Sequence, residues 1–144
     1  MVLLETKNLS KSFGGLRAVW DVNVQIEKGT IHGLIGPNGS GKSTFFNLIT
    51  GIYKPDSGSN INFAGQDITT QSAYQIAALG VSRTFQLLRL FLDMTVLENV
   101  MVGYHCHTPY GILSPIFRGT KVRKAENKIR KEMIELLEFL GLVE

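Results

Sequence analysis

The chain has 144 residues, of which 44% are hydrophobic, and carries a formal net charge of +3. This size and apolar content suit one compact domain that builds its own core without disulfide bonds. Cys106 is the single cysteine, which excludes an internal disulfide and gives no sign of an oxidising compartment. Residues 1–7 lack a signal-peptide pattern, and no segment approaches the roughly eighteen apolar residues of a membrane-spanning helix. We therefore expect a cytosolic polypeptide that does not itself cross a membrane.

Two segments near the start of the chain alternate apolar and polar side chains. They comprise residues 3–9 and 19–26, with Gly14 and Gly15 between them. A period of two predicts two antiparallel strands joined by a turn. The apolar run at 31–35 that follows predicts a buried strand.

A glycine-rich loop comes directly after this run. Residues 36–44 read Gly-Pro-Asn-Gly-Ser-Gly-Lys-Ser-Thr and fill the pattern G-x-x-x-x-G-K-[S/T]. Glycines allow backbone N–H groups to wrap around phosphate oxygens, Lys42 supplies a positive charge for the β and γ phosphates, and Ser43 offers a hydroxyl to Mg²⁺. A helix predicted from Ser43 to Thr50 would direct its positive end at the same anion. The sequence predicts a nucleoside triphosphate site formed by Gly36, Asn38, Gly39, Ser40, Gly41, Lys42, Ser43 and Thr44.

Turn residues and side-chain periodicity divide the middle of the chain. Gly51 is the expected cap of the loop helix, and Pro55 prevents its continuation. The further predicted elements are a strand at 60–64, a turn at 65–67, a helix at 72–79 ended by Gly80, and a short strand at 81–85.

The last part of the chain has helical patterns. Thr95 and Glu98 predict a capping box at the start of a helix, residues 103–119 a connector, and residues 120–140 an amphipathic helix. A basic run at 118–131 is interpreted first as a solvated face, with a membrane, partner or nucleic-acid contact as alternatives. Adjacent side chains such as those of His105-Cys106-His107 cannot all converge on one ion, so no metal other than Mg²⁺ is expected.

Several ordered motifs together resemble the N-terminal part of an ATP-binding cassette (ABC) subunit over essentially the whole chain. Besides the loop, they are Lys-Ser-Phe-Gly-Gly-Leu at 11–16, Arg-Thr-Phe-Gln at 83–86 and Met-Thr-Val-Leu-Glu-Asn-Val at 94–100. Within that family they are most similar to the subunits of branched-chain amino-acid importers. The resemblance implies an α/β fold, a P-loop NTPase of ABC type. Its expected parts are an antiparallel β region at 1–30, a P-loop core with part of the parallel sheet at 31–86, and the start of a helical region at 87–144.

The same resemblance assigns roles outside the loop. Phe13 takes the position that stacks on adenine, with Val19 beside it, and Gln86 that of the glutamine that reaches Mg²⁺ and the attacking water. Lys42 and Gln86 are thus the expected catalytic residues, Ser43 and Gln86 the expected metal ligands, and ATP and Mg²⁺ the expected cofactors. Two other interpretations stay open, a core aromatic for Phe13 and a solvated strand end for Gln86.

The chain is also expected to have partners. The apolar run Leu87, Leu88, Leu90, Phe91 and Leu92 needs either the protein's own core or, as the resemblance implies, a coupling helix of a membrane permease. The resemblance further implies a second ATP-binding subunit and a peripheral position on the cytoplasmic face of the cell membrane. No nucleic-acid partner is expected.

Three elements that an ABC subunit needs do not occur between residues 86 and 144: the Leu-Ser-Gly-Gly-Gln signature, an apolar strand ending in Asp-Glu, and a switch histidine. We therefore expect a truncated cassette that binds MgATP weakly or not at all and hydrolyses it negligibly, whereas the complete subunit is an ATPase that powers import. Loss of neighbouring strands would leave the 31–35 strand at an open edge.

Other classes of protein also contain a phosphate loop. An ABC-type ATPase of DNA repair, chromosomes or translation is the main alternative. A GTPase is disfavoured because Asn-Lys-Ile-Arg at 127–130 departs from the guanine-reading pattern N-K-x-D and no D-x-x-G switch occurs. A GTPase and a small-molecule kinase are both disfavoured because the antiparallel unit before the loop, with Phe13 in it, suits adenine stacking.

Overall fold

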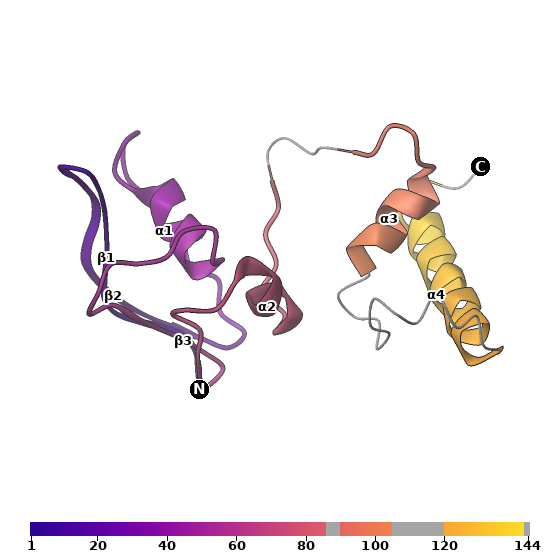
Figure 1. Ribbon diagram of the computed structural model, residues 1–144, viewed down its shortest axis with the longest axis horizontal. Coiled ribbons are helices and arrows are strands. Elements are labelled where there is room, and N and C mark those ends of the chain that lie inside the picture. Colours follow the sequence, from indigo (N-terminus) through magenta and orange to yellow (C-terminus); the bar gives the residue numbers. More distant parts are fainter. Residues whose placement is uncertain (86–89, 105–119, 143–144) are drawn as a thin grey trace. The chain divides into compact units, whose positions relative to one another are not determined.

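The computed structural model describes residues 1–85, 90–104 and 120–142, with the stretch 120–126 as backbone only (Figure 1). The chain divides into two compact units, Met1–Arg83 and Thr84–Glu144. The first unit contains the sheet and the phosphate-loop segment, and the second contains two helices.

The sheet of the first unit has four described strands in the order β2-β1-β3-β4, all antiparallel. The strands are β1 (Val2–Phe13), β2 (Leu16–Glu27), β3 (Asn60–Phe63) and β4 (Gln66–Asp67). The long β1–β2 hairpin turns at Gly14, where φ is 57° and a glycine avoids the strain that a side chain would bring. The strands predicted at 3–9, 19–26 and 60–64 are confirmed.

The hairpin is irregular, and one irregularity lies close to the loop. Lys11 pairs with Val19, but the next residue of β1, Ser12, pairs with Arg17, so Ala18 is an extra residue in β2. A bulge of this kind strengthens the local twist and redirects backbone groups. It leaves the Ala18 carbonyl oxygen facing Gly41, at the end of the glycine-rich loop.

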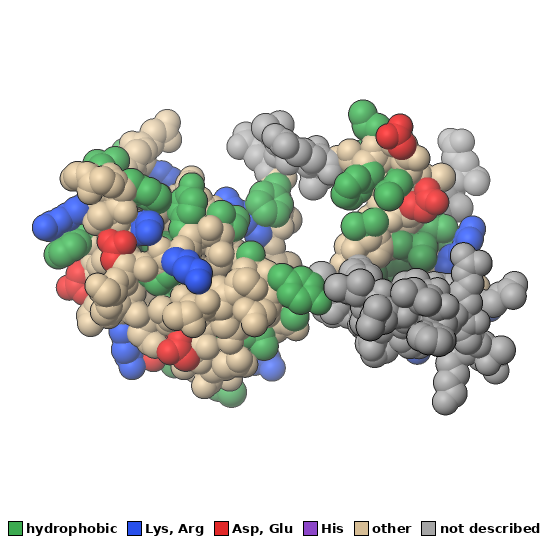
Figure 2. All heavy atoms as spheres, in the orientation of Figure 1, with side chains coloured by type: hydrophobic (Ala, Val, Ile, Leu, Met, Phe, Trp, Pro, Cys, Tyr) green, Lys and Arg blue, Asp and Glu red, His purple; other side chains and the backbone are tan. Residues whose placement is uncertain are grey.

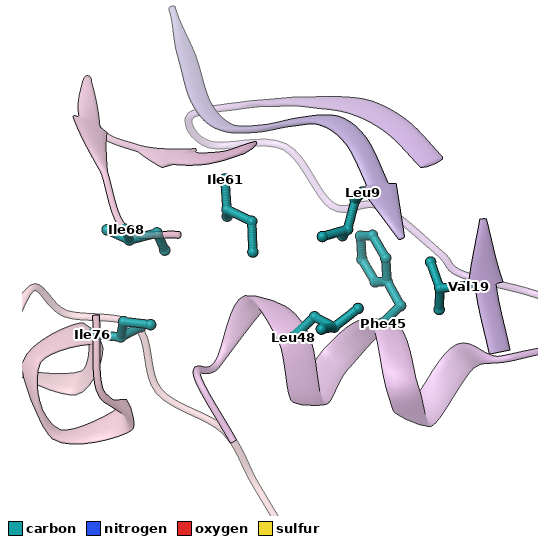
Figure 3. Packing of buried hydrophobic residues seen from close by; sticks show 7 residues of the cluster. All are labelled: Leu9, Val19, Phe45, Leu48, Ile61, Ile68 and Ile76. Carbon is teal, nitrogen blue, oxygen red and sulfur yellow. The ribbon is translucent and has the colours of Figure 1, made fainter. Parts of the chain in front are cut away.

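Helices α1 (Lys42–Ile49) and α2 (Ala73–Ala78) pack with the sheet around a single hydrophobic cluster. Figure 3 shows Phe45 and Leu48 pointing from α1 toward Leu9 of β1. The other buried members of the cluster are Val19, Ile61, Ile68 and Ile76. Each fully buried side chain of this size stabilises the fold by roughly 1.5–3 kcal/mol, so this cluster holds α1 on the sheet. Both helices confirm the predictions for 43–50 and 72–79.

The predicted buried strand at 31–35 is wrong. These residues form no strand in the described part of the chain, and Ile35 is 92% exposed. A parallel core strand needs neighbours that are distant in sequence on both sides, and no described strand pairs with this run. Figure 2 shows the first unit from one side, with hydrophobic side chains among the exposed ones.

The predicted short strand at 81–85 is also wrong, because these residues have irregular backbone. Val81 nevertheless packs against the hydrophobic cluster. The expected portion of the parallel sheet is therefore absent from the described residues, although the antiparallel part has formed. The antiparallel strands find their partners among one another, whereas no described strand pairs with 31–35 or 81–85.

The second unit contains α3 (Val96–Tyr104) and α4 (Thr120–Phe139). The capping box is confirmed: Thr95 N donates to the Glu98 carboxylate at 2.7 Å, and Glu98 N donates to the Thr95 hydroxyl at 3.3 Å. The α4 prediction is confirmed as well. Met133 and Leu137 are buried, but the expected apolar face is only partly covered, because Leu136 and Leu140 are exposed.

Of the connector predicted at 103–119, Gly103 and Tyr104 instead belong to α3, and residues 105–119 lie outside the described part. The basic run at 118–131 is described with its side chains only from residue 127. Within it, Lys128 forms an ion pair with Glu132 at 3.7 Å.

In the 144-residue chain, backbone amides of residues 31–35 should exchange with solvent at almost unprotected rates, because they take part in no strand. Amides of the β1–β2 ladder should be protected under the same conditions. Native-state hydrogen exchange measured by mass spectrometry or NMR tests this. Protection of 31–35 equal to that of β1 would show that the run is paired.

Acid should loosen the start of α3. The Thr95 backbone N–H, followed by the Thr95 hydroxyl, holds the pKa of Glu98 below its usual 4.5. A lowered pKa means that the stabilisation is complete above 4.5 and is lost as the pH falls through the folded-state pKa. An NMR titration of the Glu98 carboxyl carbon and of the α3 amides would follow this loss. Glu98→Gln should remove the pH dependence of the α3 amides, whereas Glu135→Gln on α4 should leave it intact.

Candidate phosphate-binding site

The glycine-rich loop enters α1 through residues that only glycine suits. Gly39 and Gly41 have φ values of 82° and 88°, in the left-handed region. Ser40 N donates to the Pro37 carbonyl at 3.3 Å and closes a turn. Gly41 is the cap residue of α1, where no side chain accepts from the first helical turn. The amides at this end of α1 are therefore available to an acceptor that approaches the loop.

The loop passes very close to the β2 bulge. A Cβ atom added to Gly41 would lie well inside contact distance of the Ala18 carbonyl oxygen. A Cβ on Gly36 would lie 2.7 Å from the Ser40 hydroxyl oxygen. Gly41 is thus required by close approach to backbone as well as by conformation, whereas a side chain at Gly36 would meet only the Ser40 side chain.

Lys42 lies in an electropositive position. It is the first residue of α1, whose first turn contains no acidic residue, so the helix dipole opposes its charge. Its ammonium group donates to the carbonyl oxygens of Gly36 and Pro37, each at 2.7 Å, and contacts the Ser40 hydroxyl at 3.5 Å. Positive charge gathered in this way suits an anion with several oxygens, which accepts from the amides and from Lys42 together.

The loop and the hairpin share one cavity of about 360 Å³. Phe13, at the end of β1, lines it and is 42% exposed. The loop side of this cavity is formed by Asn38, Gly39, Ser40, Gly41, Lys42, Ser43 and Thr44. The structure therefore brings the expected aromatic residue and most of the expected loop residues to the same cavity.

Gly36 and Val19 do not line this cavity but an adjoining one that also contains Gly41 and Lys42. Both line a second cavity of about 450 Å³, together with apolar side chains that include Trp20, Ile35 and Phe45. Val19 is 5% exposed and belongs to the hydrophobic cluster. It does not line the cavity of Phe13, so its expected place beside adenine stays a prediction.

Sequence reasoning missed three residues of β2 on the wall of the first cavity: Leu16, Arg17 and Ala18. The Arg17 guanidinium lies 3.9 Å from the centroid of the Trp20 ring. Sequence reasoning also missed two residues that contact Phe13. The Tyr53 ring meets the Phe13 ring edge to face, and the Lys11 ammonium lies over it. Lys11 precedes Phe13 by two residues in β1, so the strand period of two could have placed both side chains on one face. Tyr53 comes from the segment after α1, and no local motif indicates its contact with Phe13.

Gln86 lies outside the described residues, as do Leu87, Leu88 and the segment His105-Cys106-His107. Shortly before Gln86, Arg83 donates to the Asn47 side chain of α1 at 2.6 Å. Within the described residues no group of three or more His, Cys, Asp or Glu is placed to hold a metal ion. Of the helices that are described, none has the length and apolarity to span a bilayer.

The apolar segment Leu90–Phe91–Leu92 is exposed, with Leu92 at 91%. Its backbone is nevertheless held, since Phe91 N donates to the Asn99 side chain at 2.9 Å and Asn99 donates back to the Phe91 carbonyl at 3.1 Å. Close by in sequence, Met94, Glu98, Met101 and Val102 line an open cavity of about 510 Å³. In the described part, the core interpretation of this run is thus not supported for Leu90 to Leu92.

Known proteins share both the sequence and the fold. A probable branched-chain amino acid transport ATP-binding protein, LivG, of Archaeoglobus fulgidus is 44% identical over 144 residues, which is 99% of this chain and 54% of the relative. LivG of Escherichia coli K12, a high-affinity branched-chain amino acid transport ATP-binding protein, is 42% identical over 142 residues, or 99% of this chain and 55% of the relative. The chain thus spans about half the length of these relatives.

Solved structures of ATP-binding cassettes have a similar fold. A nucleotide-free ATP-binding cassette from an ABC transporter matches 99% of this chain and 55% of its own, with a TM-score of 0.74 and 37% identity. The ADP conformation of an ATP-binding cassette matches with the same TM-score and coverage and 38% identity.

A glycine-rich loop that leads into an uncapped helix with a lysine at its first position defines a phosphate-loop nucleotide-binding protein. Residues 19–144 match the ABC transporter family, and the chain belongs to that family. The ABC-type α/β fold class is thereby confirmed.

Gly41→Ala should lower the free energy of unfolding more than Gly39→Ala does. Both changes force a side chain into left-handed backbone, which costs about 1 kcal/mol. Only Gly41 has the Ala18 carbonyl in its way, whereas nothing lies within 4 Å of a Cβ on Gly39. Urea denaturation of the two variants measures the difference. Equal losses would show that the loop does not need its close approach to β2.

Proposed function

We propose that the full gene product is the ATP-binding subunit of an ABC importer, in which binding and hydrolysis of ATP drive solute uptake. One observation carries the proposal: Phe13 and the loop residues at the N-terminus of α1 line the same cavity. The names of the relatives make branched-chain amino acids the first solutes to test.

Lys42 and the loop amides bind the phosphates in this proposal. On binding, the Lys42 ammonium exchanges the carbonyl oxygens of Gly36 and Pro37 for phosphate oxygens. The amides at the start of α1 donate to the same anion, and Phe13 stacks on adenine. Val19 then supports the hairpin from the core side.

The residues present fit Mg²⁺. Ser43 and Thr44, which both carry hydroxyl groups, line the cavity, and Mg²⁺ prefers hard oxygen ligands shared between the protein and the phosphates. When bound, the ion neutralises charge that develops on the transferred phosphoryl group. Ser43 is the proposed protein ligand here, and Gln86 the proposed second ligand that also orients the attacking water.

The proposed function also implies a division of the chain into three parts. We propose residues 1–30 as the antiparallel region, which β3 and β4 also join, residues 31–86 as the P-loop core, and residues 87–144 as the start of the helical region. Because the signature and the Asp-Glu motif do not occur in these 144 residues, we propose that this chain by itself hydrolyses ATP negligibly.

Permease subunits and a second ATP-binding subunit are the proposed partners, at the cytoplasmic face of the cell membrane. The segment Leu90–Phe91–Leu92 supports a permease contact, since its side chains are exposed while Asn99 holds its backbone. A fixed backbone that presents apolar side chains lowers the ordering cost of docking.

Lys42→Ala should weaken MgATP binding by about ten- to a hundredfold, the loss expected for hydrogen bonds from a charged donor. Isothermal titration calorimetry on the full gene product measures this, with Lys28→Ala in an exposed turn as the control. Unchanged affinity of the Lys42 variant would overturn the nucleotide site.

Transport is tested separately. Disrupting the gene should lower uptake of radiolabelled leucine, isoleucine and valine, and a Lys42→Ala copy should not restore it. Normal uptake in the disrupted strain, with ATP binding intact, would reject the importer assignment and direct attention to other ABC ATPases. ATP turnover by the 144-residue chain that is lost with Lys42→Ala would contradict its proposed inactivity.

A further inference from the structure

We propose that Lys11 is a positioning residue for the nucleobase, which acts together with Tyr53 and Asp56 by holding the Phe13 ring in place. The inference rests on the proposed function, because it requires Phe13 to receive adenine. It assigns a role to a lysine outside the phosphate loop.

Three contacts converge on the Phe13 ring or on Lys11. The Lys11 ammonium lies 5.5 Å from the centroid of the Phe13 ring. The same ammonium pairs with the Asp56 carboxylate at 3.6 Å, and the Lys11 side chain is only 20% exposed. The Tyr53 ring meets Phe13 edge to face at 5.3 Å and 73°. Phe13 is therefore contacted by a cation and by a second aromatic ring.

The segment that supplies Tyr53 and Asp56 is attached at both ends. Tyr53 N donates to the Asn47 carbonyl of α1 at 3.0 Å, and Asp56 N donates to the Ser10 carbonyl of β1 at 2.9 Å. The helix whose first residue is Lys42 thus continues directly into the segment that supports Phe13. The phosphate loop thus adjoins the start of α1, and the segment that contacts the Phe13 ring follows the end of the same helix.

The supporting residues do not occupy the cavity. Phe13 lines the cavity that contains the loop, but Lys11, Tyr53 and Asp56 do not. Their contacts leave 42% of Phe13 exposed. A purine that stacks on this ring therefore finds it already oriented, which reduces the entropy lost on binding.

A positioning role predicts a selective effect. Lys11→Met keeps an unbranched side chain and removes the charge, so the ring loses its cation contact. Affinity for MgATP should fall about three- to tenfold, in line with a partly buried cation–π contact and the looser ring. Affinity for inorganic tripolyphosphate, which has no base to stack, should not change.

Calorimetry on the full gene product with both ligands tests this. Lys11→Arg should restore ATP affinity, since a guanidinium can contact both the ring and Asp56. Lys7→Met is the matched control, because Lys7 is also in β1 but pairs with Glu5 and is 61% exposed. In a Phe13→Leu background, Lys11→Met should have no further effect.

Each other outcome counts against the inference. Equal losses for ATP and tripolyphosphate would reveal a merely structural role, and so would an additive loss in the Phe13→Leu background. ATP binding that depends on Phe13 but not on Lys11 would overturn this inference and leave the proposed function standing. Failure of the wild-type protein to bind ATP would overturn both. Should Lys11→Met unfold the chain, Asp56→Asn takes its place. This change keeps the Lys11 charge but removes its ion pair, and ATP affinity is again compared with tripolyphosphate affinity.

Discussion

The packing of α1 on the β1–β2 hairpin is the constraint on which the rest of the structure depends. Phe45 and Leu48 of α1 bury themselves against Leu9 and its neighbours in the cluster, and this brings the start of the helix against β2. At that point the chain has room for a hydrogen atom only, which is why Gly41 faces the Ala18 carbonyl. A hydrophobic contact thereby sets the place of a polar site.

The start of α1, held against β2 by this packing, carries an unbalanced positive charge. A helix start without acidic residues and without a side-chain cap, combined with Lys42, is locally unfavourable in the absence of an anion. The loop carbonyls of Gly36 and Pro37 accept hydrogen bonds from the ammonium and make this arrangement tolerable. Local conflicts of this kind are expected where a fold serves binding, because function and stability ask for different residues.

Much of the fold was predictable because its information is local. Alternation in β1 and β2, Gly14 at the turn and the Thr95–Glu98 capping box each depend on residues close in sequence, and the structure confirms them. The strands expected at 31–35 and 81–85 were not predictable in this way. An apolar run becomes a strand only where neighbours offer hydrogen bonds, and no described strand does so here.

By itself, the sequence determined the loop, its lysine and its helix, since glycine conformation, charge and helix polarity are properties of consecutive residues. Only the tertiary structure decided that Phe13 shares a cavity with that loop, that Val19 belongs to the core, and that Lys11 pairs with Asp56. These placements follow from the bulged register of the hairpin and from the return of the chain after α1. Both arise from packing between segments that are far apart in sequence, which no local pattern encodes.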